Sequence, residues 1–290
     1  MADRGITAIP GVLVGHWTDP VARTGVTAVE LPVPNVAVVD VRGGAPGVRE
    51  TGVLEPAARQ VPVDAVVFSG GSAFGLAAAD GVVDELRLAG RGVPTPAGPV
   101  PIVPAAIIYD LAVGEATAHP GPEEGRAAWR SRSDGPVPVG RVGAGTGATV
   151  GNWRGVSHPG GVGSASVTVD GATVGALVVV NAAGDVFDLE GRSLTGGRPA
   201  DVAAPGAVAG TNTTLVLVVV DGRVGDRGEL RRAAIRAHDA LGACLRPAHT
   251  RYDGDTVFVV ACGEREVDVD LVQQATFVAV GRAVASAVAS

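Results

Sequence analysis

The chain has 290 residues, of which 46% are hydrophobic and 18% charged, a composition typical of a globular protein rather than a disordered one. Its formal net charge of −7 argues against a nucleic-acid surface, so we expect no nucleic-acid partner. All 23 basic residues are arginine, which excludes Schiff-base chemistry, a P-loop lysine and a lysine base.

The first half of the chain predicts short strands joined by glycine-rich connections. Strand-like runs occupy residues 24–31, 36–41 and 65–68. The glycine turn 69–75 follows the third run, and residues 76–88 then have helical spacing. A further helical piece is expected at residues 126–132.

The middle of the chain is rich in glycine and proline. Residues 136–163 predict loop or irregular strand. Two apolar runs, 166–169 and 173–180, flank Asp170-Gly171, which is a strong hairpin signal. Residues 193–211 read as a linker.

The last third of the chain has a regular pattern. It predicts a strand at 215–220, a helix at 229–245, a strand at 256–261 and an amphipathic helix from about 269 to 288. Because strands precede helices in both halves, we expect an α/β fold, either a four-layer αββα sandwich or an α/β sandwich.

Several kinds of site and location are not expected. The N-terminus has no apolar segment typical of a secretion signal, and the longest apolar runs, such as 176–180, are too short to span a bilayer. The five histidines and the two cysteines lack metal-ligand spacing. We therefore expect a cytoplasmic protein with no membrane partner, no metal and no cofactor.

Two glycine-rich segments are candidates for ligand binding. Residues 142–148 superficially resemble a dinucleotide fingerprint, but they neither follow a strand nor open a helix. The turn at Gly70, Gly71 and Ser72 has the right strand–turn–helix context, and its amides could bind an oxyanion or substrate. Close backbone packing explains these glycines equally well.

A candidate nucleophile lies in the segment 208–221, where Asn212, Thr213 and Thr214 lead into a hydrophobic strand. The Thr213 hydroxyl can attack the carbonyl just upstream. Cleavage there would leave Thr213 with a free amine that activates its own hydroxyl. The simpler interpretation is that two threonines open a strand, which threonine favours.

Asp253 and Asp255 lie two residues apart at the mouth of the strand 256–261. If the strand extends that far, their side chains point the same way. Two adjacent carboxylates can share a proton or orient an ammonium group. The alternative is an ordinary Asp-Gly-Asp turn.

Taken in order, a series of motifs resembles the DmpA family of self-processing N-terminal-nucleophile hydrolases, peptidase family S58. That family includes aminopeptidases, other amidohydrolases and nylon-oligomer hydrolases. The motifs extend over nearly the whole chain: Gly5-Ile6, Pro10-Gly11, Val14-Gly15-His16, Asp40–Ala45, Ser69–Leu76, Ala106–Asp110, Val142–Gly147, Gly160–Gly163, Asn181, Asn212–Thr214 and Asp253–Asp255.

The resemblance implies a function and roles for individual residues. Thr213 matches the nucleophile freed by autocleavage after Asn212, which divides a single hydrolase domain, 1–290, into segments 1–212 and 213–290. Asp253 and Asp255 match positions that orient the nucleophile, Asn181 an oxyanion-stabilising asparagine, and Tyr109 a tyrosine beside the nucleophile. The resemblance also implies an αββα fold, a small peptide or amide substrate, and a homo-oligomer, a tetramer of processed heterodimers.

The chain departs from the family pattern in one respect. Members commonly carry a lysine at one of two places, where this chain has Asn152 and Pro159. Arg154 is close in sequence, but a guanidinium does not accept protons. Two alternatives stay open beside the hydrolase: an acyltransferase of similar fold and, because of the missing lysine, an unprocessed, non-catalytic assembly protein.

Overall fold

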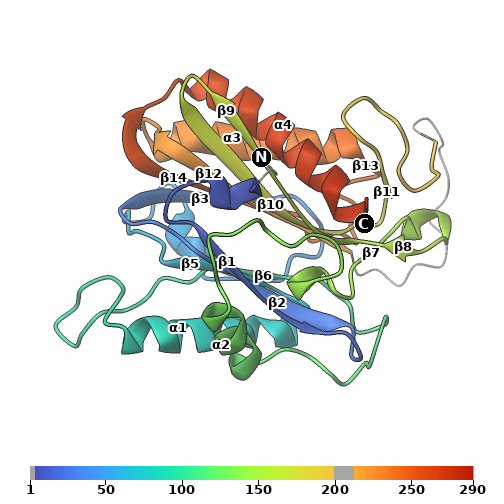
Figure 1. The fold of residues 1–290 in the computed structure, drawn as a ribbon, viewed down its shortest axis with the longest axis horizontal. Helices are drawn as coiled ribbons and strands as arrows, with labels where there is room; N and C mark the ends of the chain where they lie inside the picture. Colours follow the sequence, from blue (N-terminus) through green and yellow to red (C-terminus); the bar gives the residue numbers. More distant parts are fainter. Residues whose placement is uncertain (1–3, 199–211, 290) are drawn as a thin grey trace.

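The computed structural model describes residues 4–198 and 212–289, which build two stacked β-sheets between two layers of helices (Figure 1). The first sheet has the order β1-β2-β5-β6-β4. Its strands are β1 (Leu13–Asp19), β2 (Thr24–Glu30), β5 (Ala65–Ser69), β6 (Ala105–Ile107) and β4 (Val48–Arg49).

The second sheet has the order β3-β14-β12-β10-β9 and carries the candidate nucleophile. Its strands are β3 (Asn35–Val41), β14 (Thr256–Glu266), β12 (Thr213–Arg223), β10 (Ala172–Asn181) and β9 (Gly161–Val169). The central strand β12 pairs antiparallel with β10 and parallel with β14. Two short ribbons lie beside the sheets: β7 (Thr149–Val150) with β8 (His158–Pro159), and β11 (Asp185–Val186) with β13 (Leu245–Arg246).

Two helices cover the outer face of each sheet. α1 (Ala78–Leu88) and α2 (Pro122–Arg130) lie on the first sheet, and α3 (Arg227–Cys244) and α4 (Val269–Val288) lie on the second (Figure 1). The order of layers is helix, sheet, sheet, helix, and so the predicted αββα sandwich is confirmed.

The strand β12 contributes side chains to two hydrophobic cores, one between the two sheets and one between the second sheet and its helices. Leu215, Leu217 and Val219 are buried in the core between the sheets, and the alternate residues Val216 and Val218 are buried under the helices α3 and α4. Side chains alternate between the faces of a strand, so a strand that is covered on both faces is apolar almost throughout. This explains the hydrophobic run that follows Thr213.

The boundaries of α1, α2 and α3 differ from the prediction by one to four residues, and the starts of α1 and α2 have identifiable causes. α1 begins at Ala78 rather than residue 76, because the preceding residues Ser72–Ala77 form a 3-10 helix. α2 begins at Pro122 rather than residue 126, with proline at the first position, where its missing N–H costs nothing. The Glu124 carboxylate accepts a 2.8 Å hydrogen bond from the Gly121 N–H and so caps this start.

Most predicted strands are confirmed, and several extend beyond the predicted bounds. Asp170 and Gly171 have φ values of 48° and 73°, as the tight turn between β9 and β10 requires. The strand β1 was not predicted. Most of the predicted linker at 193–211 lies outside the described residues.

The predicted helix at 269–288 is confirmed as α4, and it is apolar over most of its length. It is the one described helix that is long and apolar enough, by length and composition, to cross a membrane. Half of its apolar stretch is buried inside the protein, where α4 packs against β9 and β10. Its apolar character is therefore accounted for by its place in the outer helical layer.

The packing of α4 on β9 depends on a glycine. A Cβ atom at Gly163 would overlap with the carbonyl oxygen of Ala283 in α4. We expect Gly163→Ala to lower the free energy of unfolding by about 1–3 kcal/mol through overpacking. Gly242→Ala is the matched control: its Cβ would meet no atom within 4 Å in α3, and it should raise stability by about 0.5–1 kcal/mol. Urea unfolding measures both, and equal effects would contradict the packing argument.

Candidate active site

Thr213 lies where β12 begins, among residues that are distant in sequence. In the antiparallel register of β10 and β12, Thr213 lies opposite Asn181. On the other side, Asn212 forms a parallel bridge with Asp253. Asn181, Asn212, Thr213 and Asp253 are all at most 3% exposed. The fold thus brings the predicted nucleophile together with the predicted asparagine and one of the predicted carboxylates.

The Thr213 hydroxyl lies against the carbonyl group that it would have to attack. Its Oγ1 donates a 2.6 Å hydrogen bond to the Asn212 carbonyl oxygen, and the Gly254 N–H donates to the same oxygen at 2.9 Å. A Cβ on Gly254 would approach Thr213 Oγ1 to 2.8 Å, so the glycine leaves room for the hydroxyl. One carbonyl is therefore both polarised by an amide and adjacent to a nucleophile.

Asn181 is held by a hydrogen bond at each end of its side-chain amide. Its Oδ1 accepts from the Thr149 N–H at 2.9 Å, and its Nδ2 donates to the Tyr109 carbonyl oxygen at 3.3 Å. Since an amide nitrogen has two N–H groups, one remains for an acceptor in the site. Tyr109 reaches this cluster through its backbone.

The two predicted carboxylates bind neighbouring segments, while the Thr213 hydroxyl donates to the Asn212 carbonyl oxygen. Asp255 Oδ1 accepts from the Thr214 N–H at 2.7 Å. Asp253 accepts from the Ala183 N–H at 3.3 Å and from the Thr250 N–H and hydroxyl at 2.8 and 2.5 Å. Burial, and then the charge of Asp255, raise the pKa of Asp253 above its ordinary value.

The pair His249 and His238 extends the cluster behind Asp255, and sequence analysis did not assign it a role. His249 donates to Asp255 Oδ2 from its backbone N–H at 3.0 Å, and its Nδ1 lies 2.7 Å from the same oxygen. The His238 ring packs edge-on against the His249 ring, with 4.8 Å between the ring centroids. Its Nε2 is hydrogen-bonded to the Asp40 carbonyl oxygen at 3.0 Å. His249 is six residues from Asp255, but His238 is on α3, so only the fold reveals this pair.

The two histidines have opposite pKa shifts. Burial lowers the pKa of His249, but the hydrogen bond and charge of Asp255 outweigh it and leave that pKa raised. Burial, together with the nearby His249, lowers the pKa of His238 to about 4. Relative to a free histidine, the fold therefore favours the protonated form of His249 and the neutral form of His238.

Asn152, which stands at one of the two family lysine places, contacts the residue before Thr213. Its Nδ2 lies 2.9 Å from Asn212 Oδ1 and 3.0 Å from Thr149 Oγ1. The nearby Arg154 guanidinium binds both oxygens of Asp185, at 2.6 and 2.7 Å. The charge of Arg154 is thus matched by Asp185, while a neutral amide anchors Asn212.

The backbone amides of the turn Gly70–Ser72 already have hydrogen-bond partners. The amide groups of its three residues, in order, donate to the Gly25 carbonyl, the Asp110 carboxylate and the Ile108 carbonyl, at 2.9, 2.7 and 2.9 Å. None is free for an oxyanion in this arrangement. Across residues 4–198 and 212–289, no group of three or more His, Cys, Asp or Glu side chains could hold a metal ion.

Residues 4–290 match the model of peptidase family S58. An uncharacterized aminopeptidase of Mycobacterium leprae is 42% identical over 292 residues, covering 90% of this chain and 79% of that protein. A 6-aminohexanoate-oligomer endohydrolase of Paenarthrobacter ureafaciens is 30% identical over 275 residues, covering 88% and 74%.

Two solved structures are similar in fold. A beta-aminopeptidase of Burkholderia sp. superposes with a TM-score of 0.77 at 22% identity, covering 98% of this chain and 86% of that chain. The L-aminopeptidase D-Ala-esterase/amidase of Ochrobactrum anthropi, described as a variant of the Ntn hydrolase fold, also has a TM-score of 0.77, at 23% identity, covering 98% and 85%.

The histidine pair predicts a pH dependence of opposite sign for its two members. The stability from His249 is complete below the unfolded pKa and is lost as pH rises through its raised folded pKa. The stability that the neutral His238 contributes is complete above pH 6.5, its ordinary pKa, and is lost as the pH falls toward its folded pKa of about 4. NMR titration of the ring signals should show both shifts, and Asp255→Asn should lower the pKa of His249.

The exposed Asp239 on α3 provides the control for this titration. Asp239 follows His238 in sequence, but its carboxylate pairs with Arg236 at 2.7 Å. Asp239→Asn should leave the pKa of His249 in place. An unchanged His249 titration in Asp255→Asn would show that Asp255 does not determine its charge.

Proposed function

The chain belongs to peptidase family S58, and we propose that it is an N-terminal-nucleophile hydrolase in which Thr213 becomes the nucleophile after autocleavage of the Asn212–Thr213 bond. One observation carries the proposal: the Thr213 hydroxyl and the Gly254 amide converge on the Asn212 carbonyl, at 2.6 and 2.9 Å from its oxygen. Since hydroxyl and carbonyl belong to adjoining residues, this places Oγ1 close to the carbonyl carbon as well.

The processing reaction follows from this geometry. Thr213 Oγ1 attacks the Asn212 carbonyl carbon, and the Gly254 N–H stabilises the charge that develops on the oxygen. The C–N bond breaks, the Thr213 nitrogen takes up the hydroxyl proton, and an ester links the two residues. Water then hydrolyses the ester, leaving a carboxylate on Asn212 and a free amine on Thr213.

The buried polar groups around Asn212 favour this bond as the one that breaks. Asn212 is 2% exposed, and its Nδ2 has no hydrogen-bond partner among the described residues. An unsatisfied buried donor costs about 1–3 kcal/mol. Asn152 holds the other end of the same side chain. Cleavage frees Asn212 to leave this position.

In the mature enzyme the new amine is the base for the reaction with substrate. An α-amine has an ordinary pKa of about 7.7–8.0, so it can take the proton of the Thr213 hydroxyl near neutral pH. The hydroxyl attacks the substrate amide, the amine portion leaves with the proton, and water hydrolyses the acyl-enzyme. The remaining N–H of Asn181, opposite Thr213, is directed to the substrate oxyanion.

The substrates that we propose are the N-terminal residues of peptides or short amide oligomers. The relatives support this class, since one is named an aminopeptidase and another a 6-aminohexanoate-oligomer endohydrolase. Both names describe hydrolysis, which favours water over an amine as the acyl acceptor. We further propose that processed chains assemble into a homo-oligomer.

Autocleavage is testable by mass spectrometry of the denatured protein. We expect two chains, of 212 residues and of 78 residues (290 − 212 = 78), the second beginning at Thr213. Thr213→Ala should stay intact, and Thr213→Ser, which keeps a hydroxyl, should cleave. Thr214→Val is the matched control, because the Thr214 hydroxyl is buried with no partner among the described residues. A wild-type chain that stays whole would overturn the proposal.

Asn181 is testable through the turnover of the processed enzyme. Asn181→Asp keeps the oxygen that accepts from Thr149 but replaces the N–H donor. We expect a fall of about 10²–10³ in kcat, as for loss of one oxyanion donor. Mass spectrometry first establishes that this variant is processed. Wild-type kcat in a processed Asn181→Asp enzyme would exclude the oxyanion role.

A further inference from the structure

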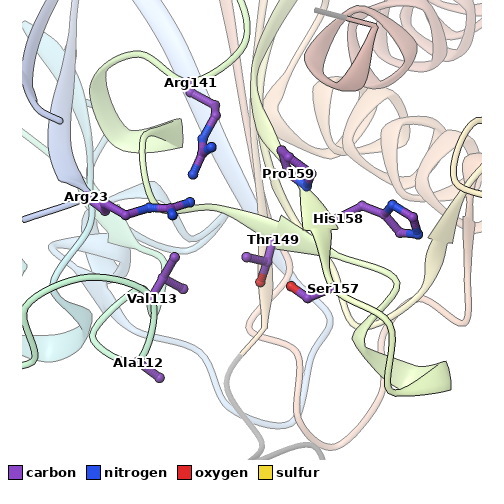
Figure 2. A pocket seen from close by; sticks show the side chains of 8 residues that line it. All are labelled: Arg23, Ala112, Val113, Arg141, Thr149, Ser157, His158 and Pro159. Atoms are coloured by element: carbon purple, nitrogen blue, oxygen red, sulfur yellow. The ribbon is translucent and has the colours of Figure 1, made fainter. Parts of the chain in front are cut away.

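Two arginines share a cavity that adjoins the candidate active site. The cavity has a volume of about 430 Å³ and is lined by Arg23, Ala112, Val113, Arg141, Thr149, Ser157, His158 and Pro159 (Figure 2). Figure 2 shows the guanidinium groups of Arg23 and Arg141 pointing into the same space beside Thr149, whereas the His158 ring points away. A second cavity of about 290 Å³ shares both arginines.

The cavity is lined by positively charged side chains, as a binding site for an anion would be. Neither cavity is lined by Asp or Glu, although the chain carries 30 acidic residues and a net charge of −7. The ion pairs of the described residues include neither Arg23 nor Arg141. Arg141 Nε donates a long 3.5 Å hydrogen bond to the Thr146 carbonyl oxygen, and the buried Nε of Arg23 has no described hydrogen-bond partner. Two adjacent cations without counter-charge are suited to a carboxylate, which arginine binds in a bidentate manner.

The backbone at Arg23 supports a role for its side chain. Arg23 lies in the turn between β1 and β2 with a φ of 56°, a left-handed conformation that favours glycine or asparagine. Asp19 shapes this turn by accepting from the Val21 and Ala22 N–H groups, each at 2.9 Å. A long cationic side chain is not needed for the turn itself.

The cavity is within reach of the proposed nucleophile. Thr149, in its lining, donates to Asn181 Oδ1, and Asn181 lies opposite Thr213. One hydrogen bond and one cross-strand pair thus place Thr149 on the order of 10 Å from Thr213. An extended chain covers about 3.3–3.6 Å per residue, so two or three α-residues, or one longer ω-amino acid, would reach from Thr213 to Thr149 in the cavity lining.

Resting on the function proposed above, we propose that Arg23 and Arg141 bind the free carboxylate at the far end of the substrate's leaving group. The substrate class is then short peptides or amino-acid oligomers with an unblocked C-terminus. The carboxylate belongs to the leaving group rather than the acyl group, because a free N-terminal ammonium on the acyl side would be repelled by two guanidinium groups.

The test compares free acids with carboxamides of the same length. Alanyl-triglycine and β-alanyl-triglycine are offered to the processed enzyme as acid and as amide, and the ratio of kcat/KM is measured. We expect the acid to be favoured at least about tenfold. Arg141→Gln, at an exposed position, and Arg23→Asn, which suits the left-handed backbone, should each bring this ratio close to one.

The control variant is Arg87→Gln, which removes an exposed arginine at the end of α1 and should leave the ratio unchanged. Arg141→Gln alone decides the matter if Arg23→Asn fails to fold. Equal rates for acid and amide in the wild type, or a preference that survives Arg141→Gln, would overturn the carboxylate site while leaving the hydrolase function standing.

Calorimetric titration with triglycine and triglycinamide separates the site from the chemistry. Triglycine should bind at least about tenfold more tightly than triglycinamide to the wild type, and equally to Arg141→Gln. This preference without hydrolysis of any peptide would keep the anion site and reject the proposed function. Hydrolysis with no binding preference would do the reverse.

Discussion

The structure of the site depends on the burial of β12 on both faces. Apolar side chains from Leu215 to Val220 are locked between the inter-sheet core and the helical layer, and both edges of the strand are hydrogen-bonded. The first residue of such a strand has little freedom, so the Thr213 hydroxyl and the Asn212 carbonyl stay in contact. For the proposed cleavage, two groups held in contact would not have to lose the entropy that a chance encounter costs.

Neighbouring groups fix the approach to this point from several directions. The Gly254 N–H donates a hydrogen bond to the Asn212 carbonyl oxygen, and the absence of a side chain at Gly254 leaves space for the Thr213 hydroxyl. Asp255 holds the next amide in β12, and Asn152 holds the Asn212 side chain. Buried polar groups of this kind are costly unless they are satisfied. Here most are satisfied by one another, which makes the cluster both specific and rigid.

The sequence predicts those parts of the fold and site that local patterns determine. The β9–β10 hairpin follows from Asp170-Gly171, and the helix at 269–288 follows from its periodicity. The order of the motifs indicates Asn181, Thr213 and Asp255 as site residues. The sequence does not predict the register in which the strands pair, and that register brings the site residues together. The pairing of Asn181 with Thr213, the amide of Gly254 at the Asn212 carbonyl and the packing of His238 on His249 exist only once the sheets are assembled.

The absence of lysine changes the charge balance of the proposed site, and His249 offsets it in part. Asp253 and Asp255 are both 1% exposed, and two buried carboxylates without a cation repel each other. His249 Nδ1 lies 2.7 Å from Asp255, whose hydrogen bond and charge raise the pKa of His249, and burial raises the pKa of Asp253. Both shifts favour the forms of these groups that carry less negative charge in total. In the proposed enzyme, less negative charge near Thr213 would hold its new amine less strongly as an ammonium. The proposed base role requires a neutral amine, so the histidine behind Asp255 would act on the chemistry proposed for Thr213.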